Sequence, residues 1–162
     1  MVVVRTARFP RDADAVAALV GEYLRQTELE KAERGLAAPG APLPARYARE
    51  IDAPAEAFGA DRVLLAAVDG VDCGVVVVRT SPRGTELSRF WTAPSARGRG
   101  VGSALLDEAL RGTDAPARLS VWRWRDDAVR LYRGRGFEVV APWDDRADLL
   151  CLERPTPLSA RR

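Results

Sequence analysis

The stretch Glu86–Ser103 reads ELSRFWTAPSARGRGVGS, and the rest of the chain is organised around it. Its first seven residues have the pattern of a polar and aromatic strand, and a proline then marks a turn. Gly98, Gly100 and Gly102 free the backbone to adopt unusual dihedral angles and to approach a ligand closely. Apolar residues at helical spacing over Val101–Leu110 predict a helix that begins at these glycines. Because a helix start presents unpaired NH groups and the positive end of the helix dipole, the sequence predicts an anion site, most naturally for phosphate.

Three kinds of glycine loop bind phosphate groups, and the residues around these glycines distinguish them. A Walker loop requires a lysine directly after its last glycine, whereas Ser103 follows Gly102 here. A dinucleotide-binding loop follows a buried hydrophobic strand directly, whereas this strand is polar and is separated from the glycines by residues 94–96. The third pattern, R-x-x-G-x-G at Arg97, Gly100 and Gly102, resembles the coenzyme A loop of the GNAT family of N-acetyltransferases.

A second motif strengthens this resemblance. Residues 126–132 read DDAVRLY and are followed by Gly136 and Phe137, which is similar to the GNAT segment A-x-x-L-Y-x-x-x-G-F. Two motifs in the family's order and separation are more specific than either alone. The resemblance covers roughly residues 62–140, and the first sixty residues match the family in the order of their elements.

The length and composition of the chain limit the number of domains, the partners and the metal sites that it can have. Its 162 residues, 47% of them hydrophobic, suit one domain, predicted as residues 1–154 with a disordered tail at 155–162. The net charge of +2 gives no argument for a nucleic-acid partner, and neither a membrane-spanning run nor a signal peptide is recognisable, so we predict no nucleic-acid or membrane partner and a cytoplasmic location. Cys73 and Cys151 lie in apolar runs and are predicted to be buried. The absence of histidine removes histidine triads and most zinc and iron sites, so no metal is expected.

Hydrophobic patterns and turn residues predict the order β-α-α-β-β-β-α-β-α-β-β. The strands are predicted at residues 2–9, 62–68, 73–80, 86–92, 118–123, 137–140 and 149–153. The helices are predicted at residues 16–24, 45–51, 101–110 and from Asp126 or Asp127 to Gly134. Residues 28–45 are predicted to be a mobile loop, and Asp69-Gly70 a hairpin turn. The fold class is therefore α/β, with a GNAT-like mixed sheet of about seven strands and flanking helices.

The resemblance implies a cleft for acetyl-CoA, the co-substrate, between the strands 86–92 and 118–123. Backbone NH groups of residues 98–103 would cradle the pyrophosphate, and the pantetheine arm would pair with the backbone of Trp91 and Thr92. Arg125 stands where the family often has asparagine. Gly134 stands where the family commonly has a basic residue, so Arg133, Arg135 or Arg130 is the candidate for the adenosine 3′-phosphate. The coenzyme-binding residues predicted in this way are Trp91, Thr92, Arg97, Gly98, Arg99, Gly100, Val101, Gly102, Ser103, Arg125 and Arg133.

The reaction that the resemblance implies is direct attack of a neutral amine on the thioester. Tyr132 matches the family's general acid, because a phenol is protonated at neutral pH and donates to a leaving thiolate. Backbone NH groups near Trp91 and Thr92 would stabilise the oxyanion. Glu86 stands eleven residues before Arg97, the spacing of the base in the histone-acetylating branch. A glutamate at a strand start is also typical of a solvated or paired charge. Tyr132 could equally be a core tyrosine on an apolar helix face, and the arginines could be solvated surface residues.

The acceptor is the least determined part of the prediction. Candidates to line its site are Glu28, Glu30, Glu33, Tyr47, Glu50, Trp143, Asp144 and Asp145, whose carboxylates and aromatic rings would suit a cationic amine. The first hypothesis is an N-acetyltransferase for a small-molecule amine or an amino acid derivative. The alternatives are acetylation of a protein N-terminus or side chain, and a non-catalytic acyl-CoA-binding module. A homodimer is possible by the same resemblance.

Overall fold

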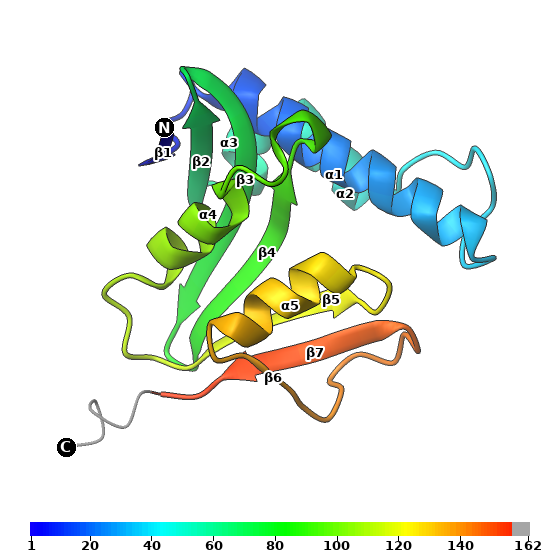
Figure 1. Cartoon of the computed structure of the whole chain (residues 1–162). Coiled ribbons are helices and arrows are strands. Elements are labelled where there is room, and N and C mark those ends of the chain that lie inside the picture. The colour runs from blue at the N-terminus through cyan, green and yellow to red at the C-terminus, as the bar shows by residue number, and fades with distance from the viewer. Residues whose placement is uncertain (157–162) are drawn as a thin grey trace.

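The structure, a computed structural model, describes residues 1–156 and is built on one seven-stranded sheet (Figure 1). The strands are β1 (Val2–Thr6), β2 (Arg62–Val68), β3 (Val71–Ser81), β4 (Gly84–Thr92), β5 (Ala117–Trp122), β6 (Glu138–Val139) and β7 (Leu149–Arg154). Their order in the sheet is β1-β2-β3-β4-β5-β7-β6. All neighbouring strands are antiparallel except β4 and β5, which are parallel. The predicted α/β fold with a mixed sheet of seven strands is thus confirmed.

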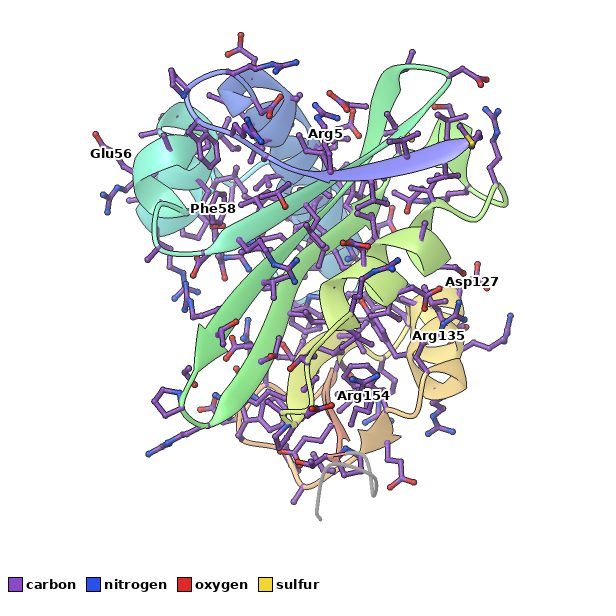
Figure 2. The ribbon with its side chains drawn as sticks, turned by 90° about the vertical axis from the view of Figure 1, so that its left-hand side faces the viewer. Arg5, Glu56, Phe58, Asp127, Arg135 and Arg154 are labelled. Carbon is purple, nitrogen blue, oxygen red and sulfur yellow. The ribbon has the colours of Figure 1, made fainter. Side chains whose placement is uncertain are left out.

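Helices cover both faces of this sheet. They are α1 (Ala13–Glu33), α2 (Ala45–Asp52), α3 (Pro54–Ala57), α4 (Val101–Leu110) and α5 (Asp126–Gly134), with a 3₁₀ turn, η1 (Pro94–Ala96), before α4. One buried cluster joins the sheet to α4 and α5, through Leu105 and Tyr132 among others. A second joins the opposite face to α1 and the segment after α3, where Phe58 is buried (Figure 2). The two cores make a three-layer molecule in which the sheet separates α4 and α5 from α1 and α2.

Most predicted elements match the structure, and the differences have physical reasons. Strand β2 and helix α4 have the predicted bounds, and the hairpin is confirmed by positive φ angles at Asp69 (51°) and Gly70 (81°). Helix α1 continues to Glu33 instead of ending near residue 24, because its polar last turns are held by an Lys31–Glu28 ion pair at 3.0 Å and by contacts to α5. The short helix α3 was not predicted. Helix α5 has Arg125 at its N-cap, so the prediction that an aspartate caps it is wrong.

Ion pairs tie the ends of several elements together. Arg5 on β1 donates to Asp72 at 2.6 Å and to Asp12 at 3.1 Å, which fixes the edge strand to the start of α1. Arg135, just after α5, donates to Asp107 on α4 at 3.1 Å (Figure 2). Both predicted buried cysteines, Cys73 and Cys151, are buried and free. Residues 157–162, most of the predicted tail, lie outside the described residues.

The site of interest lies where β4 and β5 part. The parallel ladder pairs Thr85 with Ala117 and Glu86 with Arg118, and it ends there, so the two strands diverge beyond Glu86 (Figure 1). The β3–β4 ladder is interrupted at the same level, since Val77 pairs with Ser88 and Val75 with Trp91. The extra residue on β4 is a β-bulge, and Arg89 there has a left-handed φ of 53°. The splayed strands that the resemblance implied are therefore present.

Candidate active site

The glycine-rich loop has the backbone geometry that the sequence predicted. Gly98 and Gly100 have φ angles of 77° and 82°, which L side chains rarely adopt, and Gly100 is the N-cap of α4. Gly102 lies inside the first turn of α4, where an added Cβ would stand 3.3 Å from both Phe90 and Leu131. The loop thus presents the start of a ten-residue helix whose N-cap, Gly100, and second residue, Gly102, have no side chain.

A cavity of about 670 Å³ lies in front of this loop. Its lining includes nearly every predicted coenzyme-binding residue: Trp91, Thr92, Arg97, Gly98, Gly100, Val101, Gly102, Ser103 and Arg125. Arg99 instead points toward Asp69, at 3.5 Å, and Arg133 is exposed on α5, so neither lines this cavity. Sequence reasoning missed Phe90, Trp124, Ala128 and Leu131, which complete the wall. We call this space the loop cavity.

The side chains of Trp91 and Arg97 close one wall of the loop cavity. The Arg97 guanidinium lies 5.0 Å from the centre of the Trp91 ring, and its Nε donates to the Thr92 carbonyl at 3.3 Å. The Trp91 indole NH donates to Glu22 on α1 at 3.0 Å, so that ring belongs to the opposite core. The Thr92 carbonyl, which was predicted to pair with the pantetheine arm, therefore already accepts a hydrogen bond from Arg97.

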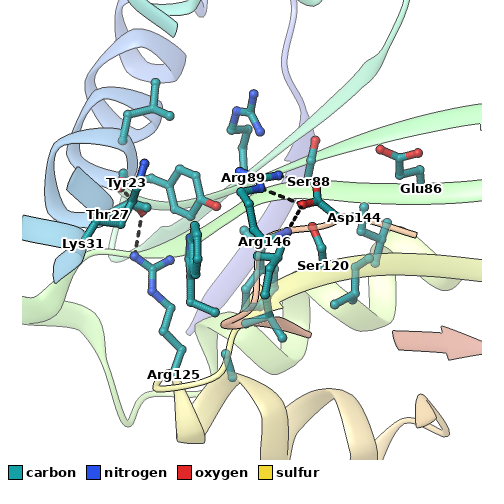
Figure 3. A pocket seen from close by; sticks show the side chains of 18 of the residues that line it. Tyr23, Thr27, Lys31, Glu86, Ser88, Arg89, Ser120, Arg125, Asp144 and Arg146 are labelled. Carbon is teal, nitrogen blue, oxygen red and sulfur yellow. Dashed lines mark hydrogen bonds and ion pairs between the residues drawn. The ribbon is translucent and has the colours of Figure 1, made fainter. Parts of the chain in front are cut away.

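A second cavity, of about 290 Å³, lies on the α1 side of the sheet (Figure 3). Its floor comes from β4 and β5 and its roof from α1, α2 and the loop between β6 and β7. The polar residues lining it are Tyr23, Thr27, Glu28, Lys31, Tyr47, Glu86, Ser88, Arg89, Ser120, Arg125, Asp144 and Arg146. Of residues 28–45, which were predicted to be a mobile loop, Glu28 and Lys31 belong to α1 and line this cavity, whereas residues 34–44 do not line it. We call this space the sheet cavity.

The two cavities meet in the gap between the splayed strands. Phe90, Arg125 and Ala128 line both of them. Phe90 is next to the bulge on β4, and Ala128 lies in the first turn of α5, directly across the gap. A ligand in the loop cavity and a second ligand in the sheet cavity would therefore both contact the residues of this junction.

Tyr132 reaches the sheet cavity from the α5 side. The side chain is 4% exposed and packs edge-on against Phe90, with ring centres 5.5 Å apart. Burial raises the pKa of the Tyr132 phenol well above its usual value. The Tyr132 phenol therefore keeps its proton at neutral pH, and it lies one helical turn after Ala128 at the junction.

Glu86 lines the same cavity at its far end. It is the last β4 residue to pair with β5, and its carboxylate accepts a hydrogen bond from Arg118 at 3.3 Å. It stands four positions before Phe90 on β4, on the order of 10 Å away. The structure thus places Glu86 in the sheet cavity but away from the junction, and a proton from the junction would reach it through water.

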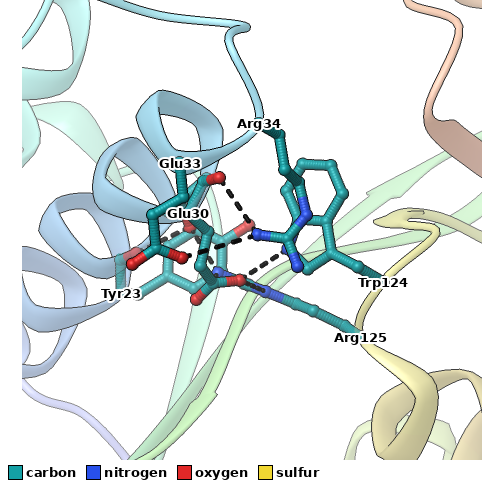
Figure 4. A network of polar contacts seen from close by, with 7 residues as sticks. Tyr23, Glu30, Glu33, Arg34, Trp124 and Arg125 are labelled. Carbon is teal, nitrogen blue, oxygen red and sulfur yellow. Dashed lines mark hydrogen bonds and ion pairs between the residues drawn. The ribbon is translucent and has the colours of Figure 1, made fainter. Parts of the chain in front are cut away.

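Arg125 is fixed between the two cavities by residues of α1 (Figure 4). Its Nε donates to Glu30 at 3.1 Å and its Nη2 to Thr27 Oγ1 at 2.7 Å. The Trp124 indole NH also donates to Glu30, at 2.7 Å, and Arg34 lies over the Trp124 ring at 4.2 Å. Burial alone would raise the pKa of Glu30, but these hydrogen bonds hold it below its usual value. Arg125 is therefore a preorganised cation at the junction.

The sequence predicted an acceptor site lined by acidic residues, and the charge of the observed lining differs from this prediction. Glu28 and Asp144 line the sheet cavity together with Tyr47 and Trp143, but both carboxylates are ion-paired. Glu30 belongs to the loop cavity, and Glu50 is buried behind Arg89. The lining residues include four cationic side chains and three carboxylates. Arg89 and Arg146 were missed because their positions depend on the bulge and on a loop.

The fold thus places an anion site at the start of α4 next to a second pocket, with a protonated tyrosine between them. This arrangement is typical of an enzyme that transfers a group from a phosphate-containing co-substrate to a second substrate. The family model described as an acetyltransferase (GNAT) domain matches residues 59–139. The chain belongs to the GNAT acetyltransferase family, and it is an acyl-CoA-dependent N-acyltransferase.

Several solved structures share the fold of this chain. The histone acetyltransferase HPA2 and related acetyltransferase from Corynebacterium glutamicum has a TM-score of 0.70 at 22% identity, with 97% of each chain covered. The PaiA N-acetyltransferase from Thermoplasma acidophilum in complex with coenzyme A has a TM-score of 0.70 at 18% identity, covering 96% of this chain and 99% of that one. An acetyltransferase of the GNAT family from Staphylococcus aureus has a TM-score of 0.68 at 10% identity, covering 97% and 100%. At these identities the likeness is one of fold.

The search of curated proteins gives no match to this sequence. Among residues 1–156, no helix combines the length and the apolar character needed to cross a lipid bilayer.

Proposed function

We propose that the protein transfers an acetyl group from acetyl-CoA to the primary amine of a small molecule or an amino acid derivative, by direct attack while both substrates are bound. The observation that carries this proposal is the meeting of the loop cavity and the sheet cavity at Phe90, Arg125 and Ala128, next to Tyr132. A volume of about 290 Å³ roofed by α1, α2 and a loop suits a small molecule better than an extended peptide.

For each step of the proposed acetyl transfer, a side chain or backbone group of the chain lies in a suitable place. The backbone NH groups of residues 98–103 hold the diphosphate of the coenzyme, where several hydrogen bonds act together with the helix dipole. The thioester is then directed to the junction, and the backbone beside the bulge at Arg89 supplies NH groups for the oxyanion. Tyr132 donates its proton to the leaving thiolate, and Glu86 accepts the ammonium proton of the acceptor through water.

The test is a panel of amines assayed for thiol release from acetyl-CoA, with Tyr132→Phe and Glu86→Gln beside the parent. We expect turnover with at least one amine and a loss of about 10²-fold or more in kcat for Tyr132→Phe. The affinity for acetyl-CoA, measured by calorimetry, should be unchanged in that variant, because the tyrosine acts on the leaving group. Full turnover by Tyr132→Phe would show that the proton donor is another group.

The alternative of a non-catalytic coenzyme-binding module predicts a different result in the same assay. In that case acetyl-CoA binds, but no amine of the panel releases thiol, and Tyr132→Phe behaves like the parent. Acetylation of peptides but not of free amines would instead favour a protein acceptor. The control variant in this assay is Gly134→Ala, on the same helix as Tyr132. It should behave like the parent, because no atom lies within 4 Å of the added Cβ.

A further inference from the structure

Two guanidinium groups converge at one end of the sheet cavity. Arg89 comes from the bulge on β4, and its guanidinium carbon lies 5.4 Å from the centre of the Tyr47 ring. Arg146 comes from the loop between β6 and β7 and faces the hydroxyl of the same tyrosine. Figure 3 shows both arginines beside Ser88 and Ser120. Two like charges are brought together in a confined space only where anions offset their repulsion.

Each arginine is held by its own carboxylate in the same geometry. Arg89 donates from Nε and Nη2 to Glu50 at 2.6 and 2.9 Å. Arg146 donates from Nε and Nη2 to Asp144 at 2.9 and 2.7 Å. Because each carboxylate occupies the Nε–Nη2 edge, Nη1 of either guanidinium is not used in its bidentate pair. A guanidinium oriented in this way is preorganised to bind a further oxyanion.

The counter-charge of Arg89 is hidden from the cavity. Glu50 is 6% exposed and does not line the sheet cavity, whereas Arg89 does. At the opposite end the arrangement is reversed, since Glu86 lines the cavity and its partner Arg118 does not. Asp144, the partner of Arg146, does line the cavity, so Arg89 is the guanidinium of this pair whose counter-charge lies outside it.

We propose that the acceptor is an amine that also carries a carboxylate, as an amino acid does, and that Arg89 and Arg146 bind this carboxylate; the inference rests on the proposed function. Arg89 immediately precedes Phe90, a junction residue, so the two ends of one small molecule reach both the junction and the arginines. The hydroxyls of Ser88 and Ser120 supply further donors along the floor. Arg89 and Arg146 are specificity residues in this assignment, and Glu50 and Asp144 position them.

The experiment compares matched sets of three acceptors: an L-amino acid, its amide, and the amine that lacks the carboxyl group, such as phenylalanine, phenylalaninamide and phenethylamine. Sets with aromatic, aliphatic and polar side chains are assayed for kcat/KM with the parent. For the best set, we expect the acid to exceed both neutral analogues by 10-fold or more. In Arg146→Gln, kcat/KM for the acid should fall about 10- to 100-fold, mainly because KM rises. The kcat/KM values for the two analogues should not change.

Two further variants keep the test specific. Arg89→Gln alone would leave Glu50 buried without a partner, so Arg89→Gln is combined with Glu50→Gln, and the same selective loss is expected. The matched control is Arg79→Gln, because Arg79 also donates from Nε and Nη2 to one carboxylate, Asp61, at 3.1 and 3.2 Å, away from both cavities. This control should not change the preference for the acid.

A binding measurement separates this inference from the proposed reaction. The N-acetylated acid and the corresponding N-acetylamine are titrated into the parent and Arg146→Gln by calorimetry, which requires no turnover. Tighter binding of the acid by the parent, lost in Arg146→Gln, supports the carboxylate site even if every amine fails to react. Equal binding of the two compounds, or an equal loss of kcat/KM for acid and analogues in Arg146→Gln, overturns the carboxylate site and leaves the acetyltransferase proposal standing.

Discussion

The buried Tyr132 makes a prediction at the scale of one residue. Burial raises the pKa of its phenol in the folded state, while the phenol in the unfolded chain keeps its ordinary pKa of about 10. The neutral phenol is present in both states below pH 10, so its contribution to stability is complete there and is lost as the pH rises. Above pH 10 the free energy of unfolding of the parent should fall by about 1.4 kcal/mol per pH unit more than that of Tyr132→Phe.

Urea unfolding followed by circular dichroism between pH 8 and pH 11 measures this difference. Phenylalanine keeps the ring that packs against Phe90, so the two proteins should have similar m-values throughout. The curves of unfolding free energy against pH should run parallel below pH 9 and diverge above pH 10. Parallel curves over the whole range would mean that Tyr132 ionises as easily in the folded protein as in the unfolded chain.

At the scale of elements, Gly74 on β3 sets the position of α4 and with it the glycine loop. An added Cβ at residue 74 would lie 2.7 Å from Val101 Cγ1 and 2.9 Å from Leu105 Cδ1. We expect Gly74→Ala to lower the free energy of unfolding by about 1–3 kcal/mol, because it overpacks this contact. It should also weaken acetyl-CoA binding, because the first turn of α4 moves away from the sheet and the loop NH groups move with it.

Val101→Ala in the same chain removes the atom that the new Cβ meets first. The double variant should therefore recover part of the lost stability and of the lost coenzyme affinity, with a coupling free energy above about 0.5 kcal/mol. Thermal unfolding and calorimetric titration of the parent, both single variants and the double variant complete the cycle. Additive effects would show that α4 does not rest on Gly74.

The elements that could be predicted from the sequence are those specified by their own residues. Strand β2 and helix α4 match their predicted bounds because an apolar run and a 3.6-residue period are local patterns. The last turns of α1 are polar and read as a loop, since their stabilising partner Arg125 lies 95 residues from Glu30. Helix α3 has four residues, too few to show a period.

In the candidate site, too, the features that depend on neighbouring residues were predictable and those that depend on distant residues were not. The glycine loop and Tyr132 were predictable because each belongs to a contiguous motif whose chemistry is local. The arginines of the sheet cavity were not, because the Arg89–Glu50 pair joins residues 39 apart and depends on a bulge that only the strand register reveals. Carboxylates close to a predicted acceptor site were therefore assigned to the substrate, although they bind arginines of the chain itself.

At the scale of the whole molecule, the arrangement of the two cavities favours the proposal that both substrates are bound together. The loop cavity is reached from the N-termini of α4 and α5, and the sheet cavity lies on the opposite face, under α1 and α2. A ligand in one therefore leaves the other accessible, and the reacting groups meet only at Phe90, Arg125 and Ala128. Both cysteines are buried in the cores and line neither cavity, so they offer no thiol to carry the acetyl group.

This arrangement predicts sequential kinetics. Double-reciprocal plots at several fixed acceptor concentrations should intersect, as expected when both substrates bind before product leaves. Mixing the protein with acetyl-CoA alone should release no stoichiometric burst of thiol, because the chain forms no acetyl intermediate. Parallel lines, together with an acetylated residue detected by mass spectrometry after incubation without amine, would contradict the prediction. The acceptor would then enter after coenzyme A has left, and the junction of the cavities would serve two half-reactions in turn.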